Sequence, residues 1–336
     1  MIAIVTVLLT CLLQDSVSFL LQSNSYQKTE INMERRQYLS SIVIPFSITL
    51  QYPSIATSMN INTLEESVDV NACKKGAIVN ESPVPGAYQQ ICMTLPTRKI
   101  PLQSTSEDII IYQGSADDSK GNSKEISGRT GTVLWNSGIC LTRLLDQISK
   151  YDSNFLKDKT VLELGTGTGL ASIAASKLGA KYVIATDGNE EVVSIATKNL
   201  QLNGVDETKG ECKKLLWNFI DAADYYDTAD IVIGSDLTYN SGTWKVLAET
   251  LEAVLKPGGV CIYLTLGHSG FNVNSELGGF LTVINSGGSL EVIEKPLKDM
   301  NIEKMLLDSL SKDEREVVQG TGGLRVVVLR KKVKSR

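Results

Sequence analysis

An acidic residue, a glycine-rich turn and a second acidic residue follow one another in the middle of the chain. Glu163 precedes a turn in which every second residue is glycine, at Gly165, Gly167 and Gly169. Glycine lets the backbone bend sharply and approach a ligand closely. Asp187 follows the turn, and an acid about twenty residues past such glycines is suited to holding the two ribose hydroxyls of an adenosine. This spacing predicts a cofactor site, for which NAD and S-adenosylmethionine are equally suitable.

The pattern of the turn separates these two cofactors. It reads Glu-x-Gly-x-Gly-x-Gly from Glu163 to Gly169, whereas the turn typical of dinucleotide binding is Gly-x-Gly-x-x-Gly. A diphosphate needs the amino terminus of the following helix left clear. S-adenosylmethionine instead carries an aminocarboxylate and a cationic sulfonium, for which an acid on the preceding strand is tolerable. The turn therefore favours S-adenosylmethionine.

Alternating strands and helices are predicted to position these residues. Short apolar runs without helical spacing predict strands over 161–164, 181–187, 211–217, 230–236 and 260–266. Helices are expected over 139–148, 170–178, 190–203 and 243–255. Late strands are expected over 289–295 and 324–331, with helical segments over 271–286 and 301–312.

This alternation predicts the fold class and the place of the site. Strands that alternate with helices of this length require right-handed crossovers and a mainly parallel sheet, so a Rossmann-like doubly wound α/β domain follows. In such sheets ligands bind beyond the carboxyl ends of the strands. Asp187 and Asp236 each end a predicted strand, so both are expected there, beside the glycine turn.

The amino-terminal part of the domain is predicted to hold short strands, over 90–94, 99–102 and 108–112. The polar segment 115–128 is interpreted as a surface loop. Proline and glycine punctuate the residues before 86, so the domain is expected to span 85–336 and residues 1–84 to form a presequence and linker.

Two targeting units are predicted within residues 1–84. Ile2 to Leu13 is an apolar run, too short to span a bilayer but suited to the core of a secretory signal, although no basic residue precedes it. Arg35 and Arg36, followed by an uncharged stretch, resemble a twin-arginine export signal. In series, the two resemble the presequences of proteins imported into complex plastids, which predicts a plastid, possibly thylakoid, destination. A single secretory signal followed by a linker is the alternative, and a cytoplasmic protein results if neither unit functions.

Charge, cysteines and histidines narrow the function further. The net charge of −5 argues against a nucleic-acid surface, which is usually basic. The six cysteines are spread singly, which suggests neither a disulfide framework nor a metal site. His268 is the only histidine, so a Ser-His-Asp hydrolase is not expected. No stable membrane span is expected in the mature domain, and no feature indicates an oligomeric state.

Five motifs in order give the chain a family resemblance. They are Gly-Thr-Val-Leu-Trp at 131–135, the turn at 161–170, Ala-Thr-Asp-Gly-Asn-Glu at 185–190, Asn-Leu-Gln-Leu-Asn-Gly at 199–204 and Asp-Leu-Thr-Tyr at 236–239. With these the sequence resembles the seven-strand S-adenosylmethionine-dependent methyltransferases, and within them methyltransferase family 16, mostly protein lysine methyltransferases. The Asp-x-x-Tyr element is the signature of that family. The resemblance covers residues 90–331 and implies a seven-strand sheet whose last strand, 324–331, runs antiparallel to the rest.

The resemblance also implies roles for single residues. Glu163 and the three glycines would wrap the methionyl end of the cofactor, and Asp187 would bind its ribose. Trp135 would contact the cofactor and Trp217 would lie beside the adenine. The family usually has an acid before that tryptophan, whereas this chain has Leu216, which puts the polar contacts to the adenine in doubt. Core packing for either tryptophan, and turn or helix capping for Asp187 and Asp236, remain the alternatives.

Asp236 and Tyr239 are the predicted catalytic residues. They would hold the target amine and the amino end of the cofactor, and both would orient the amine rather than act as a strong base. A lysine side chain with a pKa of about 10.4 must first lose its proton, which costs about 4.6 kcal/mol at pH 7. The predicted substrate is a lysine side chain of a protein. A small molecule or another protein side chain is the alternative acceptor, and a non-enzymatic cofactor-binding protein or an oxidoreductase is the other possibility.

Overall fold

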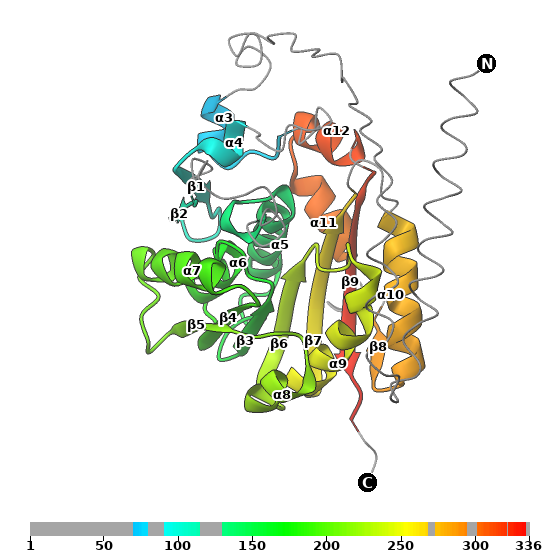
Figure 1. Cartoon of the computed structure of the whole chain (residues 1–336). Coiled ribbons are helices and arrows are strands. Elements are labelled where there is room, and N and C mark those ends of the chain that lie inside the picture. Colours follow the sequence, from blue (N-terminus) through cyan, green and yellow to red (C-terminus); the bar gives the residue numbers. More distant parts are fainter. Residues whose placement is uncertain are drawn as a thin grey trace, which may run out of the picture. The chain divides into compact units, whose positions relative to one another are not determined.

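A computed structural model describes residues 70–79, 91–114, 130–267, 273–293, 301–320 and 322–333. The predicted targeting units, the loop expected over 115–128 and His268 lie outside these residues. Within them, a seven-stranded sheet has the order β5-β4-β3-β6-β7-β9-β8 (Figure 1). Its strands are β3 (Thr160–Leu164), β4 (Tyr182–Asp187), β5 (Gly210–Lys214), β6 (Ala229–Ser235), β7 (Leu255–Leu266), β8 (Leu290–Val292) and β9 (Leu324–Lys331).

The directions of the strands confirm the predicted fold class. Strands β3 to β7 pair in parallel, and β9 pairs antiparallel with both β7 and β8. The antiparallel strand expected over 324–331 is therefore present, running against β6 and β7 in Figure 1. After β5 the chain crosses to β6 on the other side of β3, so the order of strands reverses between β3 and β6. In open α/β sheets a ligand binds at this reversal, beyond the carboxyl ends of the strands.

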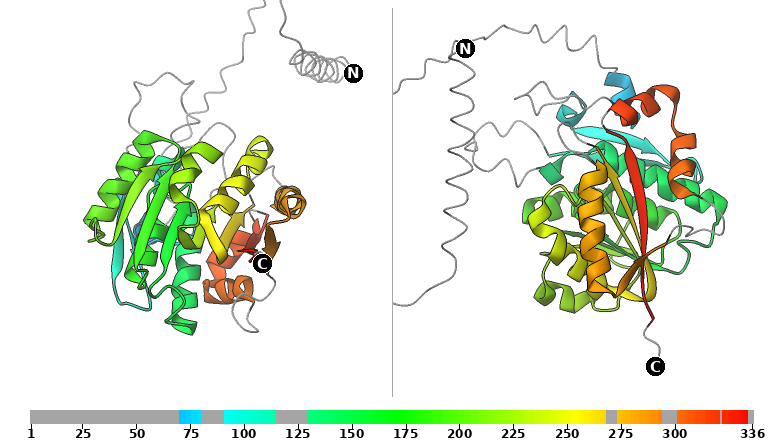
Figure 2. Two further views of the ribbon diagram at one scale, coloured as in Figure 1. Left: turned by 90° about the horizontal axis from the view of Figure 1, so that it is seen from below. Right: turned by 90° about the vertical axis from the view of Figure 1, so that its right-hand side faces the viewer.

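Helices cover both faces of the sheet (Figure 2). One layer contains α5 (Asn136–Tyr151), α6 (Leu170–Lys177), α7 (Glu190–Leu202), α11 (Ile302–Ser309) and α12 (Lys312–Gly320). The other contains α8 (Phe219–Ala222), α9 (Trp244–Val254) and α10 (Val273–Gly287). Side chains of β3 alternate between the two cores, Val161 packing into the first and Leu162 and Leu164 into the second. Glu163, on the same face as Val161, is thereby directed toward α6.

The helix predicted over 301–312 is present as α11, and a second helix that was not predicted, α12, follows it. Ser311 separates them, because its hydroxyl accepts a hydrogen bond from the Glu314 amide while a Glu314 carboxylate oxygen accepts one from the Ser311 amide. This reciprocal pair is a capping box, which starts a new helix. The sequence Ser-Lys-Asp-Glu at 311–314 carries that signal.

Residues 91–94 form helix α4 (Ile91–Thr94), not the predicted strand. Helix and strand are hard to separate in a short apolar run. The fold decides here, because Cys92 is bonded to Cys73 and its carbonyl accepts a hydrogen bond from the Gln113 side chain at 2.9 Å. The strands expected next are present as an antiparallel pair, β1 (Thr97–Pro101) and β2 (Asp108–Tyr112).

The domain also extends further toward the amino terminus than expected. Helix α3 (Val70–Lys74) and the residues up to Val79 pack against it, with Cys73 and Ile78 buried. A disulfide joins Cys73 to Cys92. The expectation that no cysteines form a disulfide is therefore wrong for this pair, whose nineteen-residue separation gives no sign of pairing in a sequence.

Candidate active site

The glycine turn joins β3 to α6 and depends on the absence of side chains. Gly165, Gly167 and Gly169 have φ angles of 61°, 54° and 85°, in the left-handed region that L-residues avoid. A Cβ atom on Gly165 would lie 2.5 Å from Cδ2 of Leu237, and one on Gly167 would lie 3.3 Å from the carbonyl oxygen of Gly131. The turn is therefore packed between two other segments, which side chains at these positions would push away.

The carboxylate of Glu163 stabilises the glycine turn through hydrogen bonds. Its Oε2 accepts hydrogen bonds from the Ser172 amide at 3.0 Å and from the hydroxyls of Ser172 and Thr166, both at 2.6 Å. Gly169, the residue that precedes α6, has no side chain to cap the helix, so Glu163 takes over that task. With 4% of its surface exposed, Glu163 holds the turn and the first turn of α6 in place. Ser172 is a partner that the sequence analysis missed.

The pKa of Glu163 makes stability depend on pH. Burial of the charged form outweighs its hydrogen bonds and raises the pKa from 4.5 to about 7. Because the folded state then binds the proton more tightly than the unfolded chain, the stability from this group is fully present below the unfolded pKa and is lost as pH rises through 7.

Substitution of Glu163 by glutamine is expected to remove this dependence. Between pH 5 and pH 8 the wild type should lose stability relative to Glu163→Gln by on the order of 2–3 kcal/mol. Thermal unfolding of both proteins, followed by circular dichroism across that pH range, measures the difference. A gap between the two melting temperatures that stays constant with pH would contradict the assignment.

Asp187 lies at the end of β4, beside the turn. Its Oδ2 accepts the Gly167 amide at 3.3 Å and its Oδ1 accepts the Asn189 amide at 3.0 Å. Burial raises the pKa of Asp187, and these amides oppose the shift. A carboxylate can accept about four hydrogen bonds, so capacity for ligand hydroxyls remains. Asn189 caps α7 by accepting the Glu191 and Val192 amides, so Asp187 is not a helix cap. Its bond to the Asn189 amide, two residues later, does cap the turn after β4, which was the other part of its alternative role.

Asp236 follows β6 in a strained conformation. Its φ is 51°, which is uncommon outside glycine and, where it occurs, tends to cluster at functional sites. The Asp236 amide donates to the carbonyl of Leu264 at 3.0 Å, and Oδ1 accepts the Leu266 amide at 2.8 Å. Strand β7 thus fixes both the backbone and the carboxylate of Asp236.

Buried side chains bond the backbone of the residues after Asp236, and an exposed tyrosine follows these residues. The buried hydroxyl of Tyr263 accepts the Leu237 and Thr238 amides at 3.0 and 3.2 Å. The Trp244 indole donates to the Thr238 carbonyl at 2.7 Å. Tyr239 itself is 63% exposed, so its side chain is accessible to an incoming molecule.

Leu237 brings this loop against the glycine turn. The position of a Cβ on Gly165 is close both to the Leu237 side chain and, at 3.9 Å, to Cζ2 of Trp217. Trp217 also packs, partly buried, against the core that contains Leu237. It therefore both contributes to core packing and borders the site. The predicted residues around β3 and β6 therefore meet where the order of strands reverses.

The segment that precedes Trp135 contacts the glycine turn. Gly131 contacts Gly167, and residues 130–132 form a short 3-10 helix whose Thr130 carbonyl accepts the Trp135 indole N–H at 2.8 Å. Trp135 then precedes α5 as its amino-terminal cap residue. The contact with the turn is thus made by Gly131, four residues before the tryptophan.

Leu216 gives the site an apolar wall at the position where the resemblance implies an acid. Its Cδ2 lies 3.4 Å from the position of a Cβ on Gly188, directly after Asp187. The Asp221 carboxylate accepts the Leu216 amide at 3.0 Å. The nearby acid is therefore Asp221, on α8, and not residue 216.

Comparison with known proteins identifies the region that carries the site. Residues 120–276 match a family model described as lysine methyltransferase. These residues are thus similar to the lysine methyltransferase family.

Three curated relatives are similar to parts of the chain. Protein-lysine N-methyltransferase EFM3 of Chaetomium thermophilum is 39% identical over 39% of this chain and 41% of its own length. Calmodulin-lysine N-methyltransferase of Arabidopsis thaliana is 30% identical over 53% and 59%, respectively. Histidine protein methyltransferase 1 homolog of Dictyostelium discoideum is 30% identical over 59% and 56%. The chain thus spans about half the length of these relatives.

The family motif at 199–204 contains two residues whose part in the site the sequence did not reveal. Asn199, fully buried, donates to the Thr168 carbonyl in the glycine turn at 2.8 Å and to the Tyr112 carbonyl at 2.9 Å. Asn203, one helical turn later, bonds both backbone groups of Ile110. Asn199 on α7 and Asn203, the residue that caps its carboxyl end, are four residues apart and pair with alternate residues of β2. They fasten the β1–β2 hairpin beside the glycine turn.

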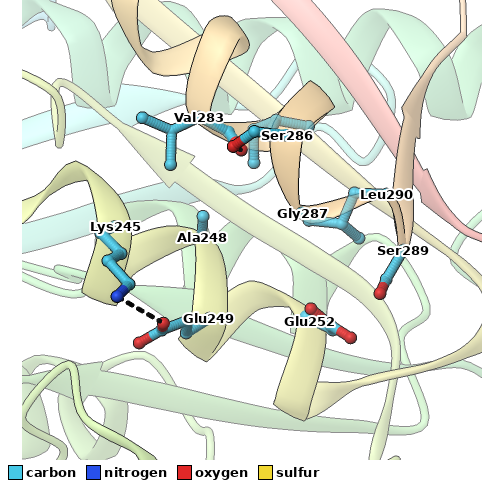
Figure 3. Close-up of a pocket in the computed structure, with 10 residues that line it drawn as sticks. Lys245, Ala248, Glu249, Glu252, Val283, Ser286, Gly287, Ser289 and Leu290 are labelled. Atoms are coloured by element: carbon cyan, nitrogen blue, oxygen red, sulfur yellow. Dashed lines mark hydrogen bonds and ion pairs between the residues drawn. The ribbon is translucent and has the colours of Figure 1, made fainter.

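Other features of the described residues lie away from this site. A groove of about 300 Å³ runs between α9 and α10, where Lys245 pairs with Glu249 (Figure 3). None of its lining residues belongs to the family motifs.

Within the described ranges, no helix combines the length and apolar character that a membrane span requires. No group of three or more histidine, cysteine, aspartate and glutamate side chains among those residues could hold a metal ion.

Proposed function

We propose that this chain is an S-adenosylmethionine-dependent protein-lysine N-methyltransferase. The observation that carries the proposal is that three features meet at one edge of the sheet. They are the glycine turn after β3, Asp187 at the end of β4 and the Asp236–Tyr239 loop after β6. The match of residues 120–276 to a family model described as lysine methyltransferase supports the same activity.

The residues around the turn fit this cofactor. At Gly165 and Gly167 the backbone is bare, so a ligand can approach it closely. The amino terminus of α6 and the spare acceptor capacity of Asp187 suit, respectively, the carboxylate of a methionyl group and the hydroxyls of a ribose. Trp217 borders the turn with a flat apolar surface suited to an adenine. When bound, S-adenosylmethionine supplies a methyl group on a positively charged sulfur.

The task left to the protein is to place the nucleophile and exclude water. Asp236 is suited to orient an amine, because the Leu266 amide holds its carboxylate in one position. Tyr239 is exposed and can cover the acceptor side chain as it enters. An apolar surrounding lowers the pKa of a lysine, which offsets part of the cost of about 4.6 kcal/mol for a neutral amine at pH 7.

A protein acceptor is favoured over a small molecule by two observations. Each of the three curated relatives bears a name that specifies methylation of a protein or protein residue. Tyr239 stands open to solvent rather than inside a closed cavity, which suits a side chain presented by a large partner. The name of the Dictyostelium relative makes histidine the second candidate acceptor.

Calorimetry tests the cofactor part of the proposal. The purified chain is expected to bind S-adenosylhomocysteine saturably and to show no heat of binding with NADH. Binding of NADH without binding of S-adenosylhomocysteine would instead indicate an oxidoreductase and would overturn the proposal.

We also propose that residues upstream of Val70 direct the protein to a membrane-bound compartment, a plastid or the secretory route. The apolar run at 2–13 and the pair Arg35 and Arg36 support this. A disulfide between Cys73 and Cys92 is in keeping with passage through an oxidising compartment. Since residues 73–79 pack into the domain, any cleavage must occur before them.

A fusion of residues 1–60 to a fluorescent protein is expected to accumulate inside such a compartment. Replacement of Leu8 and Leu9 by glutamate should abolish import, because it interrupts the apolar run. Microscopy of both fusions measures the effect. A diffuse cytosolic signal from the unaltered fusion would exclude both targeting routes.

A further inference from the structure

Two buried polar side chains connect the disulfide to the backbone of the domain. Arg98 Nε donates to the Cys73 carbonyl at 3.1 Å, and Gln113 Nε2 donates to the Cys92 carbonyl at 2.9 Å. Arg98 and Gln113 are only 2% and 1% exposed. Each half of the disulfide is therefore bonded through its own carbonyl to a side chain of the β1–β2 region.

Both side chains converge on Leu134. Arg98 Nη1 donates to the Leu134 carbonyl at 3.2 Å, while Gln113 Oε1 accepts the Leu134 amide at 2.8 Å. Arg98 and Gln113 thus bond the carbonyl and the amide of Leu134, and the same two side chains bond the carbonyls of Cys73 and Cys92. Leu134 immediately precedes Trp135 and follows Gly131, which contacts Gly167 in the glycine turn.

The residue on the other side of Trp135 is held in a similar way. Asn136 Nδ2 donates to the Val79 carbonyl at 2.7 Å, and its Oδ1 accepts the Val79 amide at 3.4 Å. Val79 ends the stretch that begins at Cys73, and Arg98 Nη2 bonds the Ala77 carbonyl within it. Trp135 is therefore flanked by two residues that are bonded to the disulfide or to the stretch it anchors.

We propose that the Cys73–Cys92 disulfide is a redox latch that sets cofactor affinity by holding residues 131–136 against the glycine turn. The proposal rests on the cofactor role proposed above for that turn. The disulfide limits the freedom of residues 73–79 when they are detached, which favours their docked position. Without it, only non-covalent contacts such as those to Arg98 and Asn136 hold this stretch. Arg98, which also bonds the Leu134 carbonyl, is then held less firmly.

A dithiol reductant would open the latch by exchange. One thiolate of the reductant attacks a cysteine sulfur and forms a mixed disulfide, and its second thiol then displaces the remaining protein thiol. Two protein thiols and one reductant disulfide result, so two electrons and two protons pass to the protein. Because both cysteines are buried, this exchange requires residues 70–79 to detach locally, which also breaks their contacts with the domain.

Calorimetry on the full chain tests the latch, with S-adenosylhomocysteine as the probe. The disulfide is first verified by mass spectrometry of peptides from unreduced protein. Reduction with dithiothreitol is expected to raise the Kd at least about fivefold, in the range of typical couplings between sites, and reoxidation should restore it. Cys73→Ser/Cys92→Ser should bind weakly with and without reductant. Cys212→Ser, which alters a cysteine outside the disulfide, should respond as the wild type does.

Arg98→Lys separates the latch from general stability. It keeps the charge but loses the forked donors that bond Cys73 and Leu134 together. With the disulfide intact, this variant should bind S-adenosylhomocysteine as weakly as the reduced wild type does. Its kcat at saturating cofactor should stay within about twofold of the wild type, because weaker binding that is equal in the ground state and the transition state leaves kcat unchanged. Equal Kd values for oxidised and reduced wild type, or absence of the linked peptides, would overturn the latch alone. Failure of the oxidised wild type to bind the probe at all would overturn the proposed function as well.

Discussion

Replacement of Asp236 by asparagine should lower kcat for methyl transfer by about 100-fold, the usual effect of losing one positioned electrostatic group. Asparagine can adopt the same positive φ and can accept the Leu266 amide, so the loop should keep its shape. Only the negative charge facing the amine is lost. Initial rates at saturating S-adenosylmethionine and acceptor, with the Kd for S-adenosylhomocysteine measured in parallel, give the result. The Kd should change far less than kcat.

Asp227→Asn provides a matched control for this substitution. Asp227 also has a φ of 51°, but it precedes β6 and pairs with Lys331 at 2.6 Å, at the opposite end of that strand. Its replacement should lower the melting temperature and leave kcat unchanged. Full activity of Asp236→Asn, or an equal loss in both variants, would contradict the role assigned to Asp236.

Gly167→Ala should weaken the binding of S-adenosylhomocysteine at least about tenfold. A left-handed conformation costs a non-glycine residue roughly 1–2 kcal/mol, and about 1.4 kcal/mol corresponds to a factor of ten in affinity. The new methyl group would also lie 3.3 Å from the Gly131 carbonyl oxygen, closer than the packing allows without a shift. Relief of either strain moves the turn that is proposed to bind the methionyl group. Calorimetry measures the change.

Gly179→Ala distinguishes this local effect from general destabilisation. Gly179 has a φ of 101°, but a Cβ there meets nothing within 4 Å, and the residue follows the far end of α6. This variant should lose thermal stability while its Kd stays that of the wild type. Equal Kd values for the two alanine variants would show that the turn at Gly167 does not contact the ligand.

Much of the fold and part of the site follow from local sequence. The strands around Glu163, Asp187 and Asp236 are short apolar runs, and a parallel sheet places their carboxyl ends at one edge. The glycines at 165 and 167 are required by positive φ angles that few other residues tolerate. These features depend on neighbours in the chain, so spacing alone reveals them.

The supporting contacts could not be predicted in this way, because they join residues distant in sequence. The Leu134 backbone is bonded by Arg98 and Gln113 across 36 and 21 positions. Asn199 reaches Tyr112 across 87 positions. Glu163 supports the glycine turn by bonding Ser172, which lies on α6, nine residues further along the chain. Ser311 and Glu314 are the exception, since their capping box is local and was readable in the sequence.

Transfer of a labelled methyl group tests the central claim most directly. The purified chain is incubated with an extract of its source cells and S-adenosylmethionine labelled in the methyl group, with Asp236→Asn as the control. We predict that label enters a protein band, disappears from the gel after protease treatment and is recovered as methyllysine after acid hydrolysis. Label recovered only in small molecules, or only as methylhistidine, would contradict a protein-lysine methyltransferase.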